Sequence, residues 1–104
     1  MKEQGLFATK RYMKNDIVFI LSGKVYDYPT RETIYVGNNK HIHDQNGQYM
    51  NHSFNPTTYI NNYDVVALVN IQVGDELTFD YNINEINMAS PFIVDGIMVS
   101  GNRT

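Results

Sequence analysis

The sequence predicts an all-β domain made of short strands. Runs rich in β-branched and aromatic residues recur along the chain, and Gly, Asn, Asp or Pro follows most of them. This pattern is typical of strands joined by turns. No segment carries apolar residues at the spacing of a sustained helical stripe. About eight short strands therefore account for most of the chain.

In the first half of the chain, turn residues separate the predicted strands. The run from 17 to 21 (IVFIL) has no polar alternation, so we expect a central strand buried on both faces. Residues 24–28 alternate between polar and apolar types, which predicts a half-exposed strand. That strand should end before Pro29, which cannot donate to a ladder. The strands expected here are 5–9, 17–21, 24–28, 33–36 and 41–43.

The second half begins with an irregular polar segment. Residues 44–56 keep neither the strand period nor the helix period, and Asn46-Gly47 is a turn signal. We therefore expect a loop with one helical turn near Tyr49. The strands expected after it are 58–60 and 65–69, joined as a hairpin across a longer polar connection, then 76–81 and an extended arm at 88–94.

Composition and charge restrict the classes of function. One hundred and four residues suit one domain, and no apolar run approaches the ~20 residues of a membrane span. The first residues do not lead into a signal-peptide pattern, so we expect a soluble, intracellular, cytoplasmic protein without a membrane partner. A nuclear or host-cell location stays open. The net charge of −3 and the scattered Lys and Arg predict no direct nucleic-acid partner and favour a basic one.

Metal and nucleophile chemistry find little support in the sequence. The chain has no cysteine, which excludes disulfides, thiolate zinc sites and cysteine nucleophiles. His41-x-His43 on a strand would place both rings on one face, yet no further ligands follow at a familiar metal-binding spacing. A Gly-x-Ser-x-Gly elbow is also missing. We therefore expect no metal site and no serine nucleophile.

Three segments remain, and together they resemble the motifs of one family. They are 5–8 (GLFA), 48–56 (QYMNHSFNP) and 74–81 (GDELTFDY). In this order and at this spacing, over roughly residues 3 to 82, they resemble the SET-domain protein lysine methyltransferases. The resemblance implies a β-clip fold in which the Asn51-His52 segment and the Tyr81 segment cross in a pseudoknot-like arrangement. It also implies S-adenosylmethionine as cofactor and a narrow channel for the target lysine.

The same resemblance implies roles for individual residues. Tyr81 is expected at the catalytic centre, and Phe79 lies at the channel position where Phe is associated with adding more than one methyl group. The C-terminal arm resembles the start of a post-SET segment that has lost its cysteines, and its Phe92 is expected to fold over the cofactor or the lysine channel. The residues expected to bind the cofactor are Gln4, Gly5, Phe7, Asn51, His52 and Phe92.

The expected molecule is thus a minimal, stand-alone SET domain with a core at 1–87 and an arm at 88–104. Its substrate is expected to be a basic protein or peptide, with a histone-like tail as one candidate. Glu3 stands where the family has a glycine, and the arm has no cysteine for a zinc cluster. These departures leave a second interpretation, a catalytically silent SET-like module that binds a peptide or the cofactor alone. A homodimer, including a dimerising structural β domain, stays open.

Overall fold

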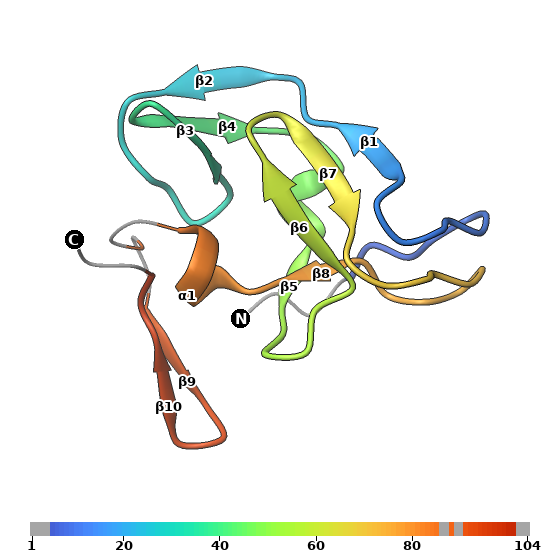
Figure 1. Cartoon of the computed structure of the whole chain (residues 1–104). Coiled ribbons are helices and arrows are strands. Elements are labelled where there is room, and N and C mark those ends of the chain that lie inside the picture. Colours follow the sequence, from blue (N-terminus) through green and yellow to red (C-terminus); the bar gives the residue numbers. More distant parts are fainter. Residues whose placement is uncertain (1–4, 86–87, 89–90, 102–104) are drawn as a thin grey trace.

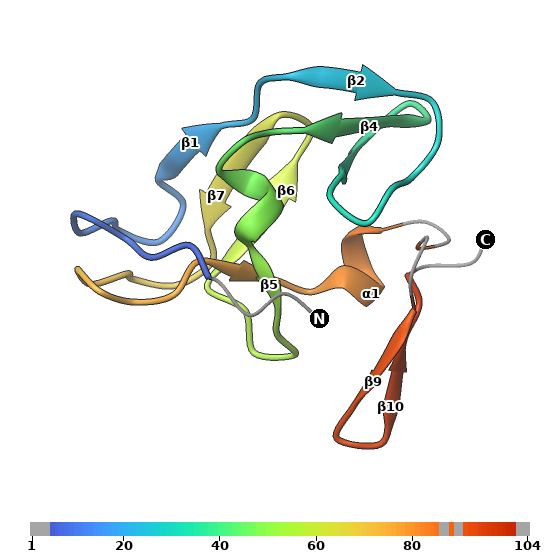
Figure 2. The same cartoon turned by 180° about the vertical axis from the view of Figure 1, so that it is seen from behind.

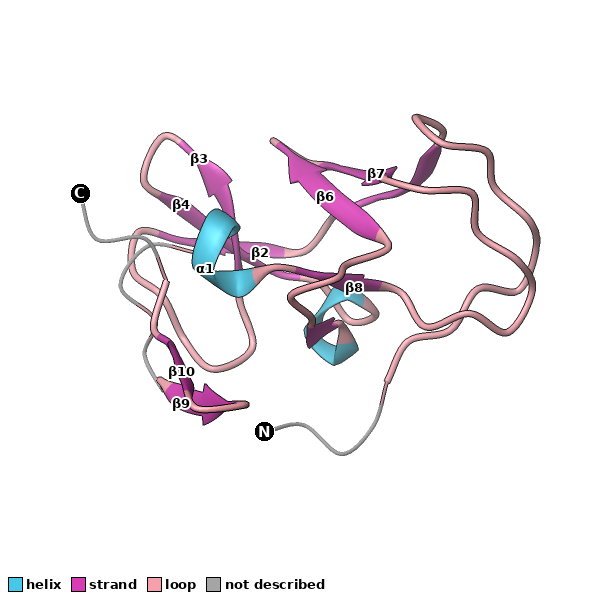
Figure 3. Ribbon diagram, turned by 60° about the horizontal axis from the view of Figure 1, so that its bottom comes forward, coloured by secondary structure: helices cyan, strands magenta, loops and turns pink. Residues whose placement is uncertain are grey.

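The computed structural model describes residues 5–85, 88 and 91–101, and strands dominate this part of the chain (Figure 1). Two short helical turns, drawn in cyan in Figure 3, interrupt them: the 3-10 turn η1 (Gly47–Tyr49) and the helix α1 (Tyr81–Asn84). The all-β prediction is confirmed. The strands are β1 (Ile17–Ile20), β2 (Lys24–Tyr26), β3 (Ile34–Gly37), β4 (Lys40–His43), β5 (Asn51–His52), β6 (Thr58–Asn61), β7 (Asp64–Ala67), β8 (Thr78–Phe79), β9 (Phe92–Val94) and β10 (Ile97–Val99).

The described strands form four small sheets. Two are three-stranded and antiparallel, in the orders β1-β7-β6 and β2-β4-β3. The parallel pair β5-β8 lies below them in Figure 1, and the antiparallel hairpin β9-β10 projects away from the rest of the domain in Figures 1 and 2. No described helix is long and apolar enough to cross a membrane.

Two-residue turns set the register of the hairpins. Asn38 and Asn39 both have positive φ between β3 and β4, and Asp95 and Gly96 do so between β9 and β10. Positive φ at both central residues is the requirement of the type I′ turn, which matches the twist of the flanking strands. The connection between β6 and β7 is also only two residues long, so the predicted longer connection is wrong.

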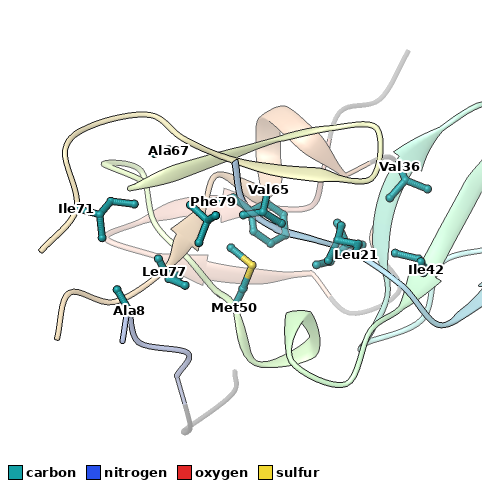
Figure 4. Close-up of a cluster of buried hydrophobic side chains, with 12 residues drawn as sticks. Ala8, Leu21, Val36, Ile42, Met50, Val65, Ala67, Ile71, Leu77 and Phe79 are labelled. Carbon is teal, nitrogen blue, oxygen red and sulfur yellow. The ribbon is translucent and has the colours of Figure 1, made fainter. Parts of the chain in front are cut away.

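An apolar cluster packs between the sheets of the domain other than the β9-β10 hairpin (Figure 4). Met50, Val65 and Phe79 lie near its middle in that view, and each is at most 2% exposed. The cluster extends to Ile42 in the sheet of β2, β4 and β3, and to Ile71 at the opposite end. The core of the domain therefore includes Phe79 of β8 and the residue directly before β5.

The strand at 17–20 differs from its prediction. β1 is an edge strand, and β7 occupies the centre of its sheet. Ile17 and Ile20 are 52% and 62% exposed, while Val18 and the following Leu21 are buried. A run of apolar residues alone gives no information about which of its faces the sheet will cover, and here one face stays largely open to solvent.

Two further strands are shorter than predicted. The segment 5–9 forms no regular strand and makes an isolated bridge between Phe7 and Glu76. The predicted strand 76–81 is regular only over Thr78–Phe79, and Tyr81 begins α1 instead of ending a strand. The irregular segment after residue 43 contains the expected helical turn at η1, but it also contains β5.

The buried His41 on β4 links fold stability to pH. His41 is 3% exposed, and its ring centroid lies 5.2 Å from that of Tyr35. Its Nδ1 has no hydrogen-bond partner in the described part of the chain. Burial lowers the pKa of His41 below 6.5, and the nearby Asp27 carboxylate only partly opposes this. As pH falls, the unfolded chain therefore takes up the proton before the folded chain does.

We predict that the free energy of unfolding is highest above pH 6.5 and falls below it, by up to about 1.4 kcal/mol per pH unit for this one group. Urea unfolding between about pH 7.5 and about pH 5 measures the slope. His41→Phe removes the titrating ring and should flatten the slope. An unchanged slope in that variant would contradict the assignment.

Candidate active site

The candidate site is built around β8, which is hydrogen-bonded along both edges. On one edge, β5 pairs with it in parallel, and the Ser53 N–H donates to the Phe79 carbonyl at 3.2 Å. The N-terminal segment continues that edge in the antiparallel sense, because the Leu77 N–H donates to the Leu6 carbonyl at 2.7 Å. Segments 6–8 and 51–53 thus follow one another along a single edge.

Two threonines cover the opposite edge of β8. The Thr57 hydroxyl donates to the Glu76 carbonyl at 2.8 Å, and the Thr58 hydroxyl donates to the Thr78 carbonyl at 2.7 Å. The chain from β5 to β6 therefore starts on one edge of β8 and ends on the other, and Figure 3 shows β8 between β6 and the η1–β5 segment. This is the crossing of two segments that the sequence resemblance implies.

Tyr81 is held in place by its backbone and by its hydroxyl. Asp80 caps α1 by accepting a hydrogen bond from the Asn82 N–H at 2.9 Å, which fixes the start of the helix. The Tyr81 N–H donates to His52 Nδ1 at 3.0 Å, and its hydroxyl donates to the Met50 carbonyl. The last residue of β5 and the residue directly before the strand therefore anchor this tyrosine.

The Tyr81 hydroxyl stays neutral. Burial raises the pKa of Tyr81 above its usual value of 10, and the carboxylates of Glu85 and Glu76 raise it further. A phenolate general base is therefore disfavoured near neutral pH. Because its proton is directed to the Met50 carbonyl, the hydroxyl oxygen keeps lone pairs that can accept a hydrogen bond from a ligand.

Aromatic rings contact the ring of Tyr81. The Phe79 ring lies 4.8 Å from that of Tyr81, and the Phe92 ring, from the C-terminal hairpin, lies 6.1 Å from it. His52 contacts Tyr81 at 5.3 Å, Phe92 at 6.1 Å and Phe54 at 4.3 Å between ring centroids. Most of these pairs meet edge to face, so the site has a wall of aromatic faces and edges, with the carboxylates of Glu76, Asp80 and Glu85 nearby.

The His52 side chain is only 3% exposed and has a defined tautomer. Its Nδ1 accepts the Tyr81 N–H, so in the neutral ring the proton lies on Nε2. That Nε2 is buried without a hydrogen-bond partner in the described residues. Burial lowers the pKa of His52, although Asp80, with Oδ1 at 3.8 Å from Nδ1, opposes the shift. The ring therefore offers one unused donor to a ligand.

The Glu76 carboxylate joins the N-terminal segment to β5. The Asn51 Nδ2 donates to Glu76 Oε2 at 2.7 Å. Gly5 lies against the same carboxylate, since a Cβ at residue 5 would come within 2.6 Å of Glu76 Oε2. Phe7 is nearby, with its ring edge 3.1 Å from that Cβ position, and is 53% exposed. Three segments distant in sequence thus meet at one carboxylate.

The structure brings most of the predicted site residues into two adjacent groups. Gly5, Phe7 and Asn51 lie around Glu76, and the other group consists of His52, Phe79, Tyr81 and Phe92. Gln4 and Glu3 lie outside the described residues. Within those residues, no group of three or more His, Asp and Glu could hold a metal ion.

The sequence did not single out three residues that the geometry adds. Glu76 lies within the motif segment 74–81, and Met50 lies within the segment 48–56. Their places in these motifs could have marked them as candidate site residues. Glu85 carried none. It is 6% exposed and accepts the Tyr35 N–H at 3.0 Å, and it thereby ties the end of α1 to β3.

We predict that His52 is neutral at pH 7, with its proton on Nε2, and that it takes up a second proton only below pH 6.5. Two-bond proton–nitrogen NMR spectra recorded against pH measure both properties, and His52→Gln assigns the signals. A proton on Nδ1 of the neutral ring would contradict the hydrogen bond from Tyr81.

Comparisons with known proteins agree with this geometry. The family model of the SET domain matches residues 3–82, a range that holds the whole of the β8 crossing and ends just after Tyr81. A comparison with curated protein sequences gives no significant match. Because the family model covers well over half of the sequence, the chain belongs to the SET domain family.

Proposed function

We propose that this protein is an S-adenosylmethionine-dependent protein lysine N-methyltransferase. The observation that carries the proposal is the convergence of three motif segments on β8 within a chain of the SET domain family. That family is one of methyltransferases. The convergence brings Tyr81, whose hydroxyl is neutral and whose ring contacts those of Phe79 and His52, next to the two segments expected to bind the cofactor.

The residues present fit the proposed cofactor. Because Gly5 has no side chain, its backbone lies close to the Glu76 carboxylate. The buried His52 Nε2–H offers a donor without a partner in the described residues. Gly5 and Phe7 would hold the methionine part, while Asn51 and His52 would hold the other end, with Phe92 beside His52. S-adenosylmethionine, when bound, supplies an electrophilic methyl group on its sulfonium.

The contribution of the chain to methyl transfer is alignment and exclusion of water. With the cofactor bound, the residues of the site would have to hold the lysine nitrogen in line with the methyl carbon and the sulfonium that it would leave, with nitrogen and carbon about 3 to 3.5 Å apart. The lysine amine must first be neutral, although the free pKa is about 10.4. Desolvation by the rings of Phe79, Tyr81 and Phe92 would disfavour the ammonium, and the carboxylates of Glu76 and Glu85 near Tyr81 would oppose this effect.

The Tyr81 oxygen orients the reacting groups. With its own proton directed to the Met50 carbonyl, it accepts a hydrogen bond from the amine or contacts the polarised methyl C–H groups. It does not remove the proton, because its raised pKa keeps it a hydroxyl. The lysine ammonium loses its proton to water before the amine enters the space lined by the aromatic rings.

The proposed substrate is a protein with a flexible basic segment. The net charge of −3 favours a basic partner, and a histone-like tail, a ribosomal protein or another cytosolic protein would supply such a segment. A cytoplasmic location is part of this proposal. A silent binding module would share the cofactor site but would transfer nothing.

We predict methyl transfer from labelled S-adenosylmethionine to at least one protein in a panel of histones, ribosomal proteins and other basic proteins. Tyr81→Phe should slow transfer by roughly 100-fold, because the amine loses its orienting oxygen. Calorimetric titration with S-adenosylhomocysteine is the control, and it should show binding by both proteins. Binding without transfer would support the silent module, and absence of both would refute the proposed function.

We also predict that the wild type adds more than one methyl group, because Phe79 leaves no hydroxyl in the channel. Phe79 is 2% exposed, so Phe79→Tyr would add a hydroxyl at a buried position of the channel. This hydroxyl should shift the products toward monomethyl-lysine. Mass spectrometry of a methylated peptide measures the distribution. Phe79→Leu is the matched variant, which adds no hydroxyl and should retain multiple methylation. Identical product distributions in wild type and Phe79→Tyr would contradict the role of residue 79.

A further inference from the structure

The Glu76 side chain occupies the junction between the two cofactor-binding segments. Its Oε2 accepts a hydrogen bond from Asn51 Nδ2 at 2.7 Å, on the side of β5. On the side of the N-terminal segment, the same oxygen lies 2.6 Å from the position of a Cβ on Gly5, and Cδ lies 3.2 Å from it. One carboxylate therefore fills the space that a side chain at residue 5 would need.

The backbone of Glu76 is fixed independently of this side chain. Phe7 forms an antiparallel bridge with it, and its carbonyl accepts the Thr57 hydroxyl at 2.8 Å. The next residue, Leu77, donates its N–H to the Leu6 carbonyl. The carboxylate is thus carried on a backbone held on both edges, and its position is determined by the strand pairing.

A side chain at residue 5 would act through Glu76. An alanine there would displace the end of the Glu76 side chain, and that displacement would weaken the charge-assisted bond to Asn51. The Asn51 carboxamide would then lose strength in its hydrogen bond to Glu76. Gly5 and Asn51 are therefore coupled through a residue that lies between them.

We propose that Glu76 is a positioning residue of the cofactor site, which helps to orient the Asn51 carboxamide and favours glycine at residue 5. The inference rests on the proposed function, because it assumes that Gly5 and Asn51 hold the cofactor. Glu76 itself touches Asn51 and need not touch the cofactor.

A double-mutant cycle on residues 5 and 76 tests this coupling. The dissociation constant for S-adenosylhomocysteine is measured by calorimetry for wild type, Gly5→Ala, Glu76→Ala and the double variant. Loss of a hydrogen bond to a charged group predicts roughly 10-fold weaker binding in Glu76→Ala and in Gly5→Ala. The double variant should bind no more weakly than Glu76→Ala, because the added methyl group then has room.

Two single variants separate positioning from simple loss of structure. Glu76→Gln keeps an oxygen that accepts from Asn51 and should stay within about 3-fold of wild type. Asp75→Asn removes the neighbouring exposed carboxylate, which bonds the Gln72 N–H at 2.8 Å within its own turn, and should leave binding unchanged. In transfer assays, Glu76→Ala should raise the KM for the cofactor and leave kcat nearly unchanged. Thermal unfolding verifies that every variant is folded.

The outcomes separate the inference from the proposed function. If wild type binds and the two single effects add in the double variant, residue 5 meets the cofactor directly and the positioning role of Glu76 is refuted. Equal weakening by Glu76→Gln and Glu76→Ala would refute it as well. If wild type itself binds no S-adenosylhomocysteine, the proposed function fails and the inference fails with it.

Discussion

Hydrogen bonding along both edges of β8 is the constraint on which the rest of the site depends. One edge is occupied by residues near 6 and 52, and the other by Thr57 and Thr58. Every partner lies about 20 or more residues away in sequence, so the chain must close several loops before any of these bonds can form. The site is therefore a product of the complete fold, since none of its segments is a local unit that could form alone.

The wall of the candidate lysine channel is also part of the core. Phe79 is 2% exposed and packs in the same cluster as Met50 and Leu77, and the Met50 carbonyl accepts the Tyr81 hydroxyl. Substitutions that widen the channel therefore also remove packing, at a cost of several kcal/mol for a large truncation. This coupling explains why conservative variants such as Tyr81→Phe are the informative ones.

Local patterns predicted what depends on local chemistry. The Asn38-Asn39 turn, the short strands and the helical turn near Tyr49 follow from backbone preferences of a few residues, whereas the Asp95-Gly96 turn that folds the expected extended arm into a hairpin was not predicted. Periodicity gave no signal for β5, which is two residues long and pairs in parallel with a strand 27 positions away. The Tyr81 helix and the role of Glu76 were missed for the same reason, because both depend on contacts made across the crossing.

The C-terminal hairpin shows how a cysteine-free arm can reach the site. A two-stranded hairpin is marginal by itself, so something must hold β9 and β10 against the domain. Asn82, directly after Tyr81, supplies this anchor: its Nδ2 donates to the Met98 carbonyl at 3.0 Å, and its Oδ1 accepts the Ser100 N–H at 3.0 Å. Val99 between them is fully buried. The helix that begins at Tyr81 thus also holds the arm that carries Phe92 to His52.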